Sequence, residues 1–555
     1  MNRQVILIVF AILWAGLQAW NHRFELYNDD AIEYIDIAKS LVNGNFALAI
    51  NPYWSPLYSW LIALSEVIFH PKGIAQIVLL KLLNLSIFIF TFCSFIRLVK
   101  VTLSRRQSDE MLPSNEMIQA LALGGFIALT LGMGGTHIDT PDMLSYGLLY
   151  LASAELLLAP TGLLANARMG FWLGLGYLTK AIILPVSCVF FVLAFFRNKA
   201  NASVRLKSTL VAILTMLAVA IPHMMAISKQ TGKLTFSEAG GLNYAWYVSR
   251  SADFLLPNFT LNKEHIGQYK HLPEVMIEKP RTLLFDKPFD SSFAAWLAPH
   301  YWFDGYVIKF SAWNQFIAIL ASVFFFARYF YLPVFLGLCL LMVLNRSCNL
   351  AFKPKAQVLE LALPSVVALG LYSVALNCNT LYSSRYFCAY FVLLYFALLT
   401  SVSISKTQTK QGKNFVIAQL VTLALLFVPG VFNIIENLEC LAKGNKNQAQ
   451  AICKRLSALG IRDGARIMLV DPVRKLAFAV VGNYKVVAES RDFESLRNDP
   501  KQCTDQMLDR CAKNKIEAIY IDNSEMKAAP DDRWKAVFDQ EQSLYVIPVR
   551  LVQSK

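Results

Sequence analysis

Asn28-Asp29-Asp30-Ala31-Ile32-Glu33-Tyr34-Ile35-Asp36 follows the first apolar stretch of the chain, residues 4–20. This short segment carries four acidic residues within eight positions. Carboxylates beside a bilayer are costly unless they face water, cations or a reacting group. We therefore expect the rest of the chain to form a membrane scaffold that holds these acids in position.

The composition predicts a polytopic α-helical membrane protein. The chain has 555 residues, of which 56% are hydrophobic and 16% charged, whereas soluble domains are usually about 45–50% apolar and about 25% charged. We expect about 11 transmembrane helices, with a range of about 10 to 13. Residues 314–345, which contain Arg328 and Pro333, form either one tilted span with an interfacial helix or two to three shorter elements. The other predicted spans are 4–20, 75–97, 117–135, 143–160, 167–179, 182–197, 207–228, 357–377, 386–403 and 414–434.

Clusters of basic residues predict the orientation of these spans, because cytoplasmic loops are rich in Lys and Arg. The clustered residues are Arg97, Lys100, Arg105 and Arg106; Arg197, Lys199, Arg205 and Lys207; Arg346, Lys353 and Lys355; and Lys406, Lys410 and Lys413. With these loops in the cytoplasm, residues 56–70 fit a surface or re-entrant helix. The outer loops are then 21–55, 136–142, 229–313 and 378–385. We expect a bacterial inner (plasma) membrane protein whose net charge of +14 requires no nucleic-acid partner.

The C-terminal part, residues 436–555, has the pattern of a small α/β domain, separate from a membrane domain over 1–435. Residues 449–459 have helical periodicity, and four short apolar runs predict strands at Ala465–Asp471, Lys485–Ala488, Ala518–Asp522 and Leu544–Val549. We expect this domain on the extracytoplasmic side. Its four cysteines allow two disulfides in an oxidising compartment, Cys440 with Cys453 and Cys503 with Cys511.

The first acidic loop contains a candidate catalytic carboxylate. Asp30 and Tyr34 are four residues apart and share a face of a surface helix, with Asp30 at the end where the helix dipole favours negative charge. Such a carboxylate can take a proton from an attacking hydroxyl or bind a divalent cation. The alternative is that Asp29 and its neighbours solvate a loop and cap a helix.

Three further polar positions accompany these acids. Asp139 and Asp142 lie between two spans on the same predicted side, and Asp142 either caps the following helix or helps to hold an acceptor or a metal. Lys180 interrupts an apolar run, where a cation either marks a function, such as binding a phosphate, or snorkels to the interface. Arg385, between two late spans, is a second candidate partner for an anionic group.

Taken in order, four motifs resemble the GT-C superfamily of membrane glycosyltransferases, in particular protein O-mannosyltransferases and the aminoarabinose transferases of lipid A. The resemblance covers roughly residues 1–435. The motifs are Asp30-x-x-x-Tyr34-x-x-Ile37-Ala38, Pro52-x-x-x-Pro56-Leu57-Tyr58, Pro141-Asp142 and Gly174-Leu175-Gly176-Tyr177-Leu178-Thr179-Lys180. These families carry a catalytic Asp-Glu pair in the first outer loop. The Tyr-x-x-Ile-Ala register aligns Asp30 with that aspartate and puts Ala31 in place of the glutamate. The alternative register gives Asp29 the role, and we favour Asp30.

The resemblance implies an inverting transfer of a sugar from a polyprenyl-phosphate donor to an acceptor hydroxyl. Asp30, with Asp29 as partner, would be the base, and Lys180 or Arg385 would stabilise the leaving phosphate. Tyr34, Asp139 and Asp142 would contact substrate, and a divalent cation, Mg or Mn, would use Asp30 and Asp142 if one is required. The acceptor is a glycan, a lipid or a protein. The competing functions are a transporter or flippase of lipid-linked sugars and a polysaccharide polymerase or ligase.

Overall fold

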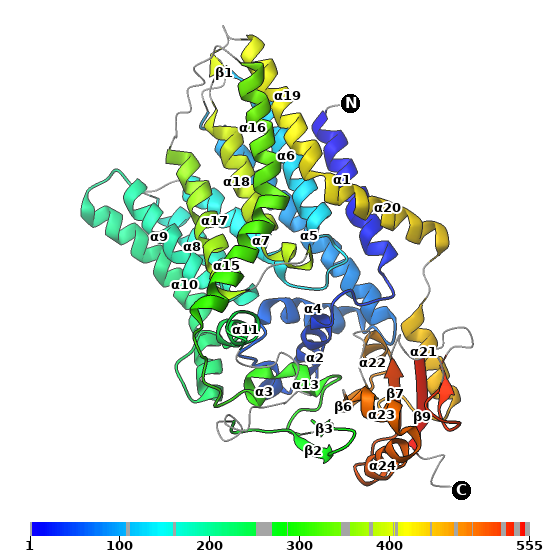
Figure 1. The fold of residues 1–555 in the computed structure, drawn as a ribbon. Coiled ribbons are helices and arrows are strands. Elements are labelled where there is room, and N and C mark those ends of the chain that lie inside the picture. The colour runs from blue at the N-terminus through cyan, green and yellow to red at the C-terminus, as the bar shows by residue number, and fades with distance from the viewer. Residues whose placement is uncertain are drawn as a thin grey trace. The chain divides into compact units, whose positions relative to one another are not determined.

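A computed structural model describes residues 3–106, 111–158, 162–250, 269–285, 287–345, 356–376, 381–402, 404–405, 409–444, 447–470, 476–490, 492–522, 529–537 and 544–549. The residues divide into two compact units (Figure 1). Unit 1 comprises Met1–Asn21, Asn84–Ser249 and Phe310–Gly444, and unit 2 comprises His22–Leu83, Arg250–Lys309 and Asn445–Lys555. This grouping differs from the predicted boundary at residue 435, because segments 22–83 and 250–309 cluster with the tail. The basic segments 346–355 and 406–408, together with Cys348 and Cys378, lie outside the described residues.

Unit 1 is a bundle of apolar helices. Its helices are α1 (Arg3–Asn21), α5 (Ala75–Leu103, which begins in unit 2), α6 (Asn115–Met133), α7 (Asp142–Leu158), α8 (Leu163–Thr179), α9 (Ile183–Arg197), α10 (Ala202–Thr231), α11 (Ala239–Asn243), α15 (Ala312–Phe326), α16 (Leu332–Leu344), α17 (Ala356–Ala375), α18 (Cys388–Ser401), α19 (Thr409–Leu426) and α20 (Val428–Lys443). A π-helical turn, η1 (Tyr244–Val248), follows α11, and β1 (Met111–Leu112) pairs antiparallel with β4 (Ile404–Ser405).

The lengths of these helices confirm an integral membrane protein. Among the described residues, six helices are long and apolar enough to cross a bilayer, or seven if the bent pair α19 and α20 is one span. Helices α9 and α18 are apolar but shorter. Within the described residues, each segment predicted as a span contains a helix, and the number of about 11 spans stays a prediction.

Two predicted spans differ in detail from the structure. Residues 312–344 form one continuous helical stretch of 33 residues, in which the π-helical turn η3 (Ala327–Tyr331) joins α15 to α16. The predicted span 414–434 is instead bent by 47° between α19 and α20. Pro429 lies in the first turn of α20, where its missing N–H costs least and where it cannot continue the preceding helix.

Two glycines bring α8 against α10. A Cβ at Gly170 would collide with the backbone carbonyl oxygen of Ala212, and one at Gly174 would lie 2.7 Å from the Cβ of Val219. Small residues four apart on a membrane helix allow such close backbone approach. This packing fixes the direction of α8, which ends directly before Lys180.

Unit 2 contains short helices and one sheet. The helices are α2 (Asp30–Val42), α3 (Phe46–Ala49), α4 (Pro56–Phe69), α13 (Ala294–Leu297), α14 (Pro299–Trp302), α21 (Gln448–Ala458), α22 (Ala477–Val481), α23 (Phe493–Asn498) and α24 (Pro500–Lys513). Helix α4 has 14 residues, which is too short for an ordinary span of about 20 residues. A surface or re-entrant placement for α4 stays a prediction.

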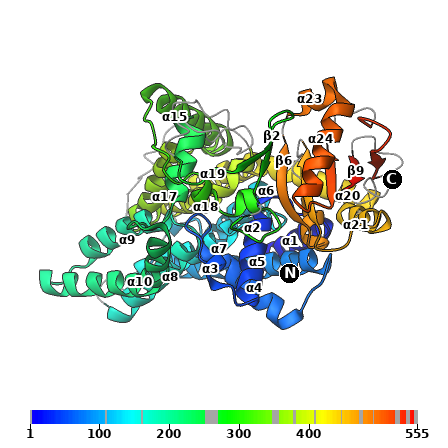
Figure 2. The ribbon, with the colours of Figure 1, turned by 90° about the horizontal axis from the view of Figure 1, so that it is seen from below.

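The sheet has seven strands in the order β2-β3-β6-β5-β7-β9-β8. Figure 2 labels its strands β2, β6 and β9. Its strands are β2 (Glu274–Ile277), β3 (Thr282–Leu284), β5 (Arg466–Val470), β6 (Lys485–Ser490), β7 (Ala518–Asp522), β8 (Lys535–Ala536) and β9 (Leu544–Pro548). All four strands predicted in the tail form, and β5 runs parallel to β6 and β7. Two strands, β2 and β3, come from the region predicted as the outer loop 229–313.

Both faces of the sheet are buried. Met468 and Ile519 belong to a core to which α24 contributes Cys503, Met507 and Cys511. The alternate residues of the strands form the other face of the sheet. On that face, the ring of Phe478 from α22 lies 4.8 Å from that of Tyr520. The alternation of side chains along each strand explains why these strands appear as continuous apolar runs in the sequence.

The predicted disulfides are wrong, because none of the four tail cysteines is in a disulfide. Cys503 and Cys511 lie eight residues apart on one helix, α24, which separates them by about 12 Å along the axis, beyond the reach of a disulfide. Cys453 instead donates to the carbonyl oxygen of Phe478 at 3.4 Å, and Cys440 lies on α20.

We expect Gly170→Ala to destabilise the protein by about 1–3 kcal/mol, because the added methyl group meets backbone that cannot rotate away. Thermal unfolding of the purified full chain in detergent measures the effect. Gly16→Ala is the matched control, since no atom lies within 4 Å of the added Cβ on α1. Equal melting temperatures for the two variants would contradict this account of the α8–α10 contact.

Candidate functional site

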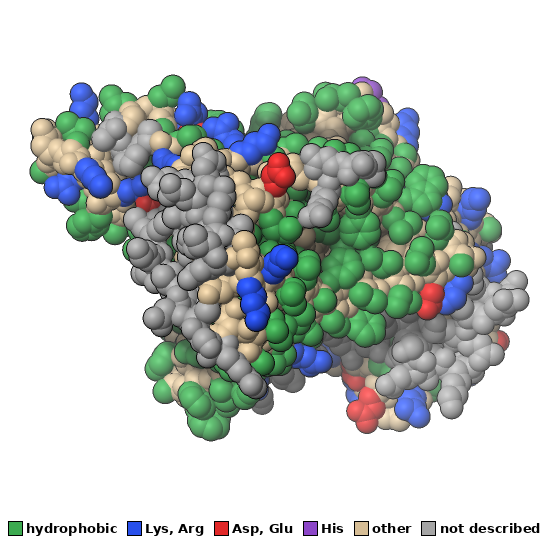
Figure 3. Space-filling view, turned by 90° about the horizontal axis from the view of Figure 1, so that it is seen from above, with side chains coloured by type: hydrophobic (Ala, Val, Ile, Leu, Met, Phe, Trp, Pro, Cys, Tyr) green, Lys and Arg blue, Asp and Glu red, His purple; other side chains and the backbone are tan. Residues whose placement is uncertain are grey.

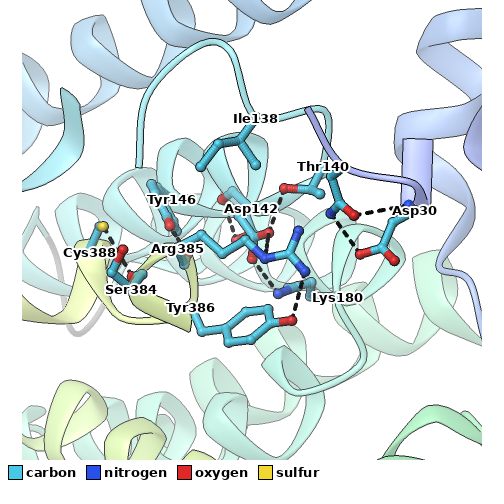
Figure 4. Close-up of polar contacts among 12 residues, drawn as sticks. Asp30, Ile138, Thr140, Asp142, Tyr146, Lys180, Ser384, Arg385, Tyr386 and Cys388 are labelled. Carbon is cyan, nitrogen blue, oxygen red and sulfur yellow. Dashed lines mark hydrogen bonds and ion pairs between the residues drawn. The ribbon is translucent and has the colours of Figure 1, made fainter. Parts of the chain in front are cut away.

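Asp142, the first residue of α7, is the centre of a buried polar cluster in unit 1 (Figure 4). Its Oδ1 atom forms an ion pair with Nζ of Lys180, and its Oδ2 atom lies 4.0 Å from Nε of Arg385. The hydroxyl of Thr140 donates to Oδ2 at 2.7 Å. The negative charge lies at a helix N-terminus, where the dipole of α7 favours it.

Lys180 and Arg385 both lie where α-helical structure is interrupted. Lys180 has an extended backbone conformation after the last residue of α8, and α9 begins three residues later at Ile183. Arg385 lies in the 3₁₀ helix η4 (Leu381–Tyr386), just before α18. The hydroxyl of Tyr146 on α7 donates to the carbonyl oxygen of Arg385, which ties η4 to α7. The structure thus brings together Asp142, Lys180 and Arg385, and the binding of an anion by the two cations stays a prediction.

Two cations share one carboxylate in this cluster. The exposed fractions of the side chains are 19% for Lys180, 5% for Arg385 and 6% for Asp142. Buried charges are unfavourable unless they are paired, and here each cation lies beside the carboxylate of Asp142. Lys180 is the most exposed of the three side chains.

Two tyrosines surround the cations, and the sequence analysis did not identify them. Nζ of Lys180 lies 4.1 Å from the centroid of the Tyr386 ring and 5.9 Å from that of Tyr372. The two rings stack with centroids 5.6 Å apart, and Nη2 of Arg385 donates to the Tyr386 hydroxyl at 2.9 Å. Tyr386 therefore contacts both cations. In the sequence, the signal for this role of Tyr386 is its position directly after Arg385.

Asp139 belongs to a different contact. Its carboxylate is fully buried and accepts a hydrogen bond of 3.0 Å from Nδ2 of Asn84 on α5. This bond joins the loop before α7 to α5. The observed role of Asp139 is therefore to hold that loop, and a contact with substrate stays a prediction.

The predicted catalytic acids, Asp29 and Asp30, belong to unit 2. Asp30 begins α2, and its Oδ2 atom accepts from Nδ2 of Asn28 at 2.8 Å. Its backbone N–H donates to Oδ1 of Asn28 at 3.0 Å, so Asn28 holds the first turn of α2. Asp29 precedes this turn and is half-buried.

Tyr34 is buried in an aromatic cluster. Its ring packs edge-on against Trp54 and Tyr58, with centroids 5.2 Å and 5.3 Å away. The structure therefore assigns Tyr34 to the packing of α2 against α4 and the residues before it, and its predicted role in substrate binding stays a prediction.

The other two acids of α2 are buried rather than solvated. Oδ2 of Asp36 accepts from the backbone N–H of Ser292 at 2.6 Å, and Oδ1 accepts from its hydroxyl at 2.8 Å. The Glu33 side chain is fully buried, and neither of its oxygens hydrogen-bonds to another described residue. Burial, followed by the negative charges of Asp36, Asp30 and Asp29, raises the pKa of Glu33 well above its ordinary value.

The donor sets around these acids fit a metal ion poorly. Within the described parts of the chain, no three His, Cys, Asp or Glu side chains form a group that could hold one. The carboxylate of Asp142 is already engaged with two cations, which repel a divalent cation at the same oxygens. A divalent cation at Asp30 and Asp142 stays a prediction from the resemblance.

Comparison with solved structures identifies the fold. The chain is similar to ArnT from Cupriavidus metallidurans bound to undecaprenyl phosphate, with a TM-score of 0.51 at 11% identity over 98% of this chain and 97% of that chain. The apo form of ArnT aligns with a TM-score of 0.41, 12% identity and the same coverage. An oligosaccharyltransferase from Archaeoglobus fulgidus, tethered with an acceptor peptide, aligns with a TM-score of 0.44 and 11% identity over 93% of this chain and 69% of that chain.

No protein-family model matches the chain, and no curated protein matches it by sequence. The fold assignment therefore rests on the first structural similarity, which extends over nearly the whole of both chains. It confirms the predicted resemblance to GT-C glycosyltransferases at the level of the fold.

Glu33 predicts a dependence of stability on pH. A carboxyl whose pKa is raised on folding stabilises the protein fully below its ordinary pKa of about 4.5. This contribution is lost as the pH rises towards the folded-state pKa, by up to about 1.4 kcal/mol per pH unit. We expect Glu33→Gln to melt progressively higher than the wild type from pH 5 to pH 8.

The matched control is Glu494→Gln, which alters an exposed glutamate of unit 2. Melting temperatures of the three proteins in detergent, measured at several pH values, test the prediction. Parallel curves for the wild type and Glu33→Gln would show that Glu33 is ionised in the folded protein.

Proposed function

We propose that this chain, which has the GT-C fold, is a membrane glycosyltransferase that uses a polyprenyl-phosphate sugar as donor. The observation that carries the proposal is the buried cluster in which one carboxylate, Asp142, meets two cations, Lys180 and Arg385. Two cations held at one carboxylate suit the binding of a phosphate group. The fold, shared with a protein crystallised with undecaprenyl phosphate bound, supports a lipid-linked phosphate as the ligand.

Each residue of the cluster has a distinct part in this proposal. Arg385 and Lys180 stabilise the charge that grows on the phosphate as it leaves the sugar. Asp142 holds both cations in place before the donor binds and reduces the cost of burying them. The Tyr386 ring and hydroxyl keep the two cations oriented.

Asp30 is the proposed general base. Its carboxylate takes the proton of an acceptor hydroxyl while that oxygen forms a bond to the anomeric carbon of the sugar. The bond between this carbon and the phosphate oxygen breaks at the same time, so the configuration inverts and the lipid phosphate leaves with the electron pair. Asp30 lies at the start of α2, the end at which a helix dipole attracts negative charge. Asp29 is the alternative base or its partner.

The remaining assignments are part of the same proposal. The reaction takes place on the extracytoplasmic face of a bacterial inner membrane, and the acceptor is a glycan, a lipid or a protein. The tail sheet of unit 2 is a candidate for acceptor selection.

We expect Asp30→Asn to lower sugar transfer by about 10²–10⁴-fold, because the base is lost. We expect Lys180→Met to lower it by about 10²–10³-fold, because one charge on the leaving phosphate is no longer compensated. Transfer is measured in membranes supplied with radiolabelled polyprenyl-phosphate sugars and an extract of candidate acceptors, and Asp29→Asn is assayed in parallel.

Asp509→Asn and Lys199→Met serve as matched controls, because both residues are exposed and remote in sequence from the proposed machinery. They are expected to retain wild-type transfer. Full activity in both Asp30→Asn and Asp29→Asn would contradict the proposed mechanism. Wild-type activity in Lys180→Met would show that Lys180 does not stabilise the leaving phosphate.

The divalent cation predicted from the resemblance is tested separately. We expect transfer to continue after treatment with EDTA, because Lys180 and Arg385 supply the positive charge at the leaving group. Loss of transfer with EDTA and its recovery with Mg²⁺ or Mn²⁺ would instead establish a metal-dependent reaction.

A further inference from the structure

The opposite end of α7 carries a second carboxylate between two cations. Glu155 lies in the last turn of α7, and its side chain is 1% exposed. Nη2 of Arg97 on α5 lies 2.5 Å from its Oε1 atom, and Nη2 of Arg168 on α8 lies 2.9 Å from its Oε2 atom. Glu155 thereby joins three helices of unit 1.

A second ion pair adjoins the first. Nη1 of Arg197 on α9 lies 2.7 Å from Oε2 of Glu360 on α17. The same nitrogen donates at 2.8 Å to the carbonyl oxygen of Leu156, the residue after Glu155. Three arginines therefore surround two carboxylates at this end of α7, and the cluster has an excess positive charge.

The arginines of the first pair are accessible. The side chain of Arg97 is 47% exposed and that of Arg168 is 42% exposed, whereas Glu155 is buried between them. A guanidinium group has five N–H donors, and Glu155 accepts from only part of each set. One cation is enough to neutralise the charge of this carboxylate. The second cation leaves positive charge and N–H donors on the surface.

The surface beside these arginines is apolar. On α5, Ile89 lies eight residues before Arg97, on the same face, and is 43% exposed. On α8, Phe171 lies three residues after Arg168 and is 41% exposed. Both residues lie towards the middle of their helices. A ligand of this surface would therefore meet cations at one end and hydrocarbon-like side chains at the other.

The Glu155 cluster is separate from the candidate functional site. Glu155 lies thirteen positions after Asp142 on α7, or about 20 Å away along the helix axis. The positive-inside rule places this end of α7 at the cytoplasmic face. Figure 3 looks onto the end of the bundle opposite to that seen in Figure 2, and Lys and Arg side chains stand there among hydrophobic ones.

We propose that Arg97 and Arg168 bind the phosphate of an anionic phospholipid from the cytoplasmic leaflet, with the acyl chains lying along Ile89 and Phe171. Glu155 positions the two guanidinium groups, whose remaining donors bind the phosphate oxygens. The lipid ties α5, α7 and α8 together at the membrane surface. This site is independent of the proposed transfer reaction.

Native mass spectrometry of the delipidated full chain tests the proposal. The protein is titrated with phosphatidylglycerol, with phosphatidylcholine of the same acyl chains, and with inorganic phosphate. We expect a phosphatidylglycerol adduct and an affinity at least about tenfold lower for the zwitterionic lipid. Arg97→Gln/Arg168→Gln is expected to lose this preference. Without the two arginines, Glu155 is a buried carboxylate without a cation, and the double variant could unfold. The triple variant that also carries Glu155→Gln removes this charge and provides the test in that case.

The matched control is Lys199→Gln/Lys207→Gln, which removes the same charge from two exposed residues on the same predicted side. Retention of the preference in this control supports a site at Glu155. An equal loss in both double variants would show a general electrostatic effect and overturn the proposal. Binding of inorganic phosphate without phosphatidylglycerol would also overturn it.

Discussion

The ion pairs of Asp142 with Lys180 and Arg385 are the constraint on which the candidate site depends. These ion pairs require three elements that are distant in sequence to meet. The elements are the start of α7, the break after α8 and the 3₁₀ helix before α18. A buried charge that lost its partner would be strongly destabilising. The close packing of α8 against α10 through Gly170 and Gly174 therefore has a functional consequence, because it fixes where α8 stops and presents Lys180.

Helix α7 carries a carboxylate in contact with two cations at each of its ends. Asp142 in the first turn and Glu155 in the last turn each contact two cations from neighbouring elements. At the N-terminal end the helix dipole stabilises the carboxylate, and at the C-terminal end it stabilises the arginines. The two clusters differ in exposure. The buried cluster at Asp142 suits a phosphate that must be kept from water, whereas the half-exposed arginines at Glu155 suit a lipid headgroup.

Features that depend on local sequence were predictable. Apolar length predicted the helices, Lys180 marked the break after α8, and continuous apolar runs predicted the tail strands. Features that depend on distant partners were not. The strand β3 pairs with β6, about 200 residues later, and no signal within its three residues indicates this. The contacts of Tyr386 with both cations and the burial of Glu33 likewise arise only when separate elements pack.

The unfavourable free energy of placing four acids on one short segment is offset differently at each position. Burial raises the pKa of Glu33 and also that of Asp36, which favours their neutral forms, and Ser292 donates two hydrogen bonds to Asp36. Asp29 and Asp30 are the half-buried acids at the start of α2. Protonation of Glu33 would reduce the repulsion on Asp30, its neighbour one turn along the helix. A neutral Glu33 thus adds no negative charge beside Asp30, the residue proposed as the general base.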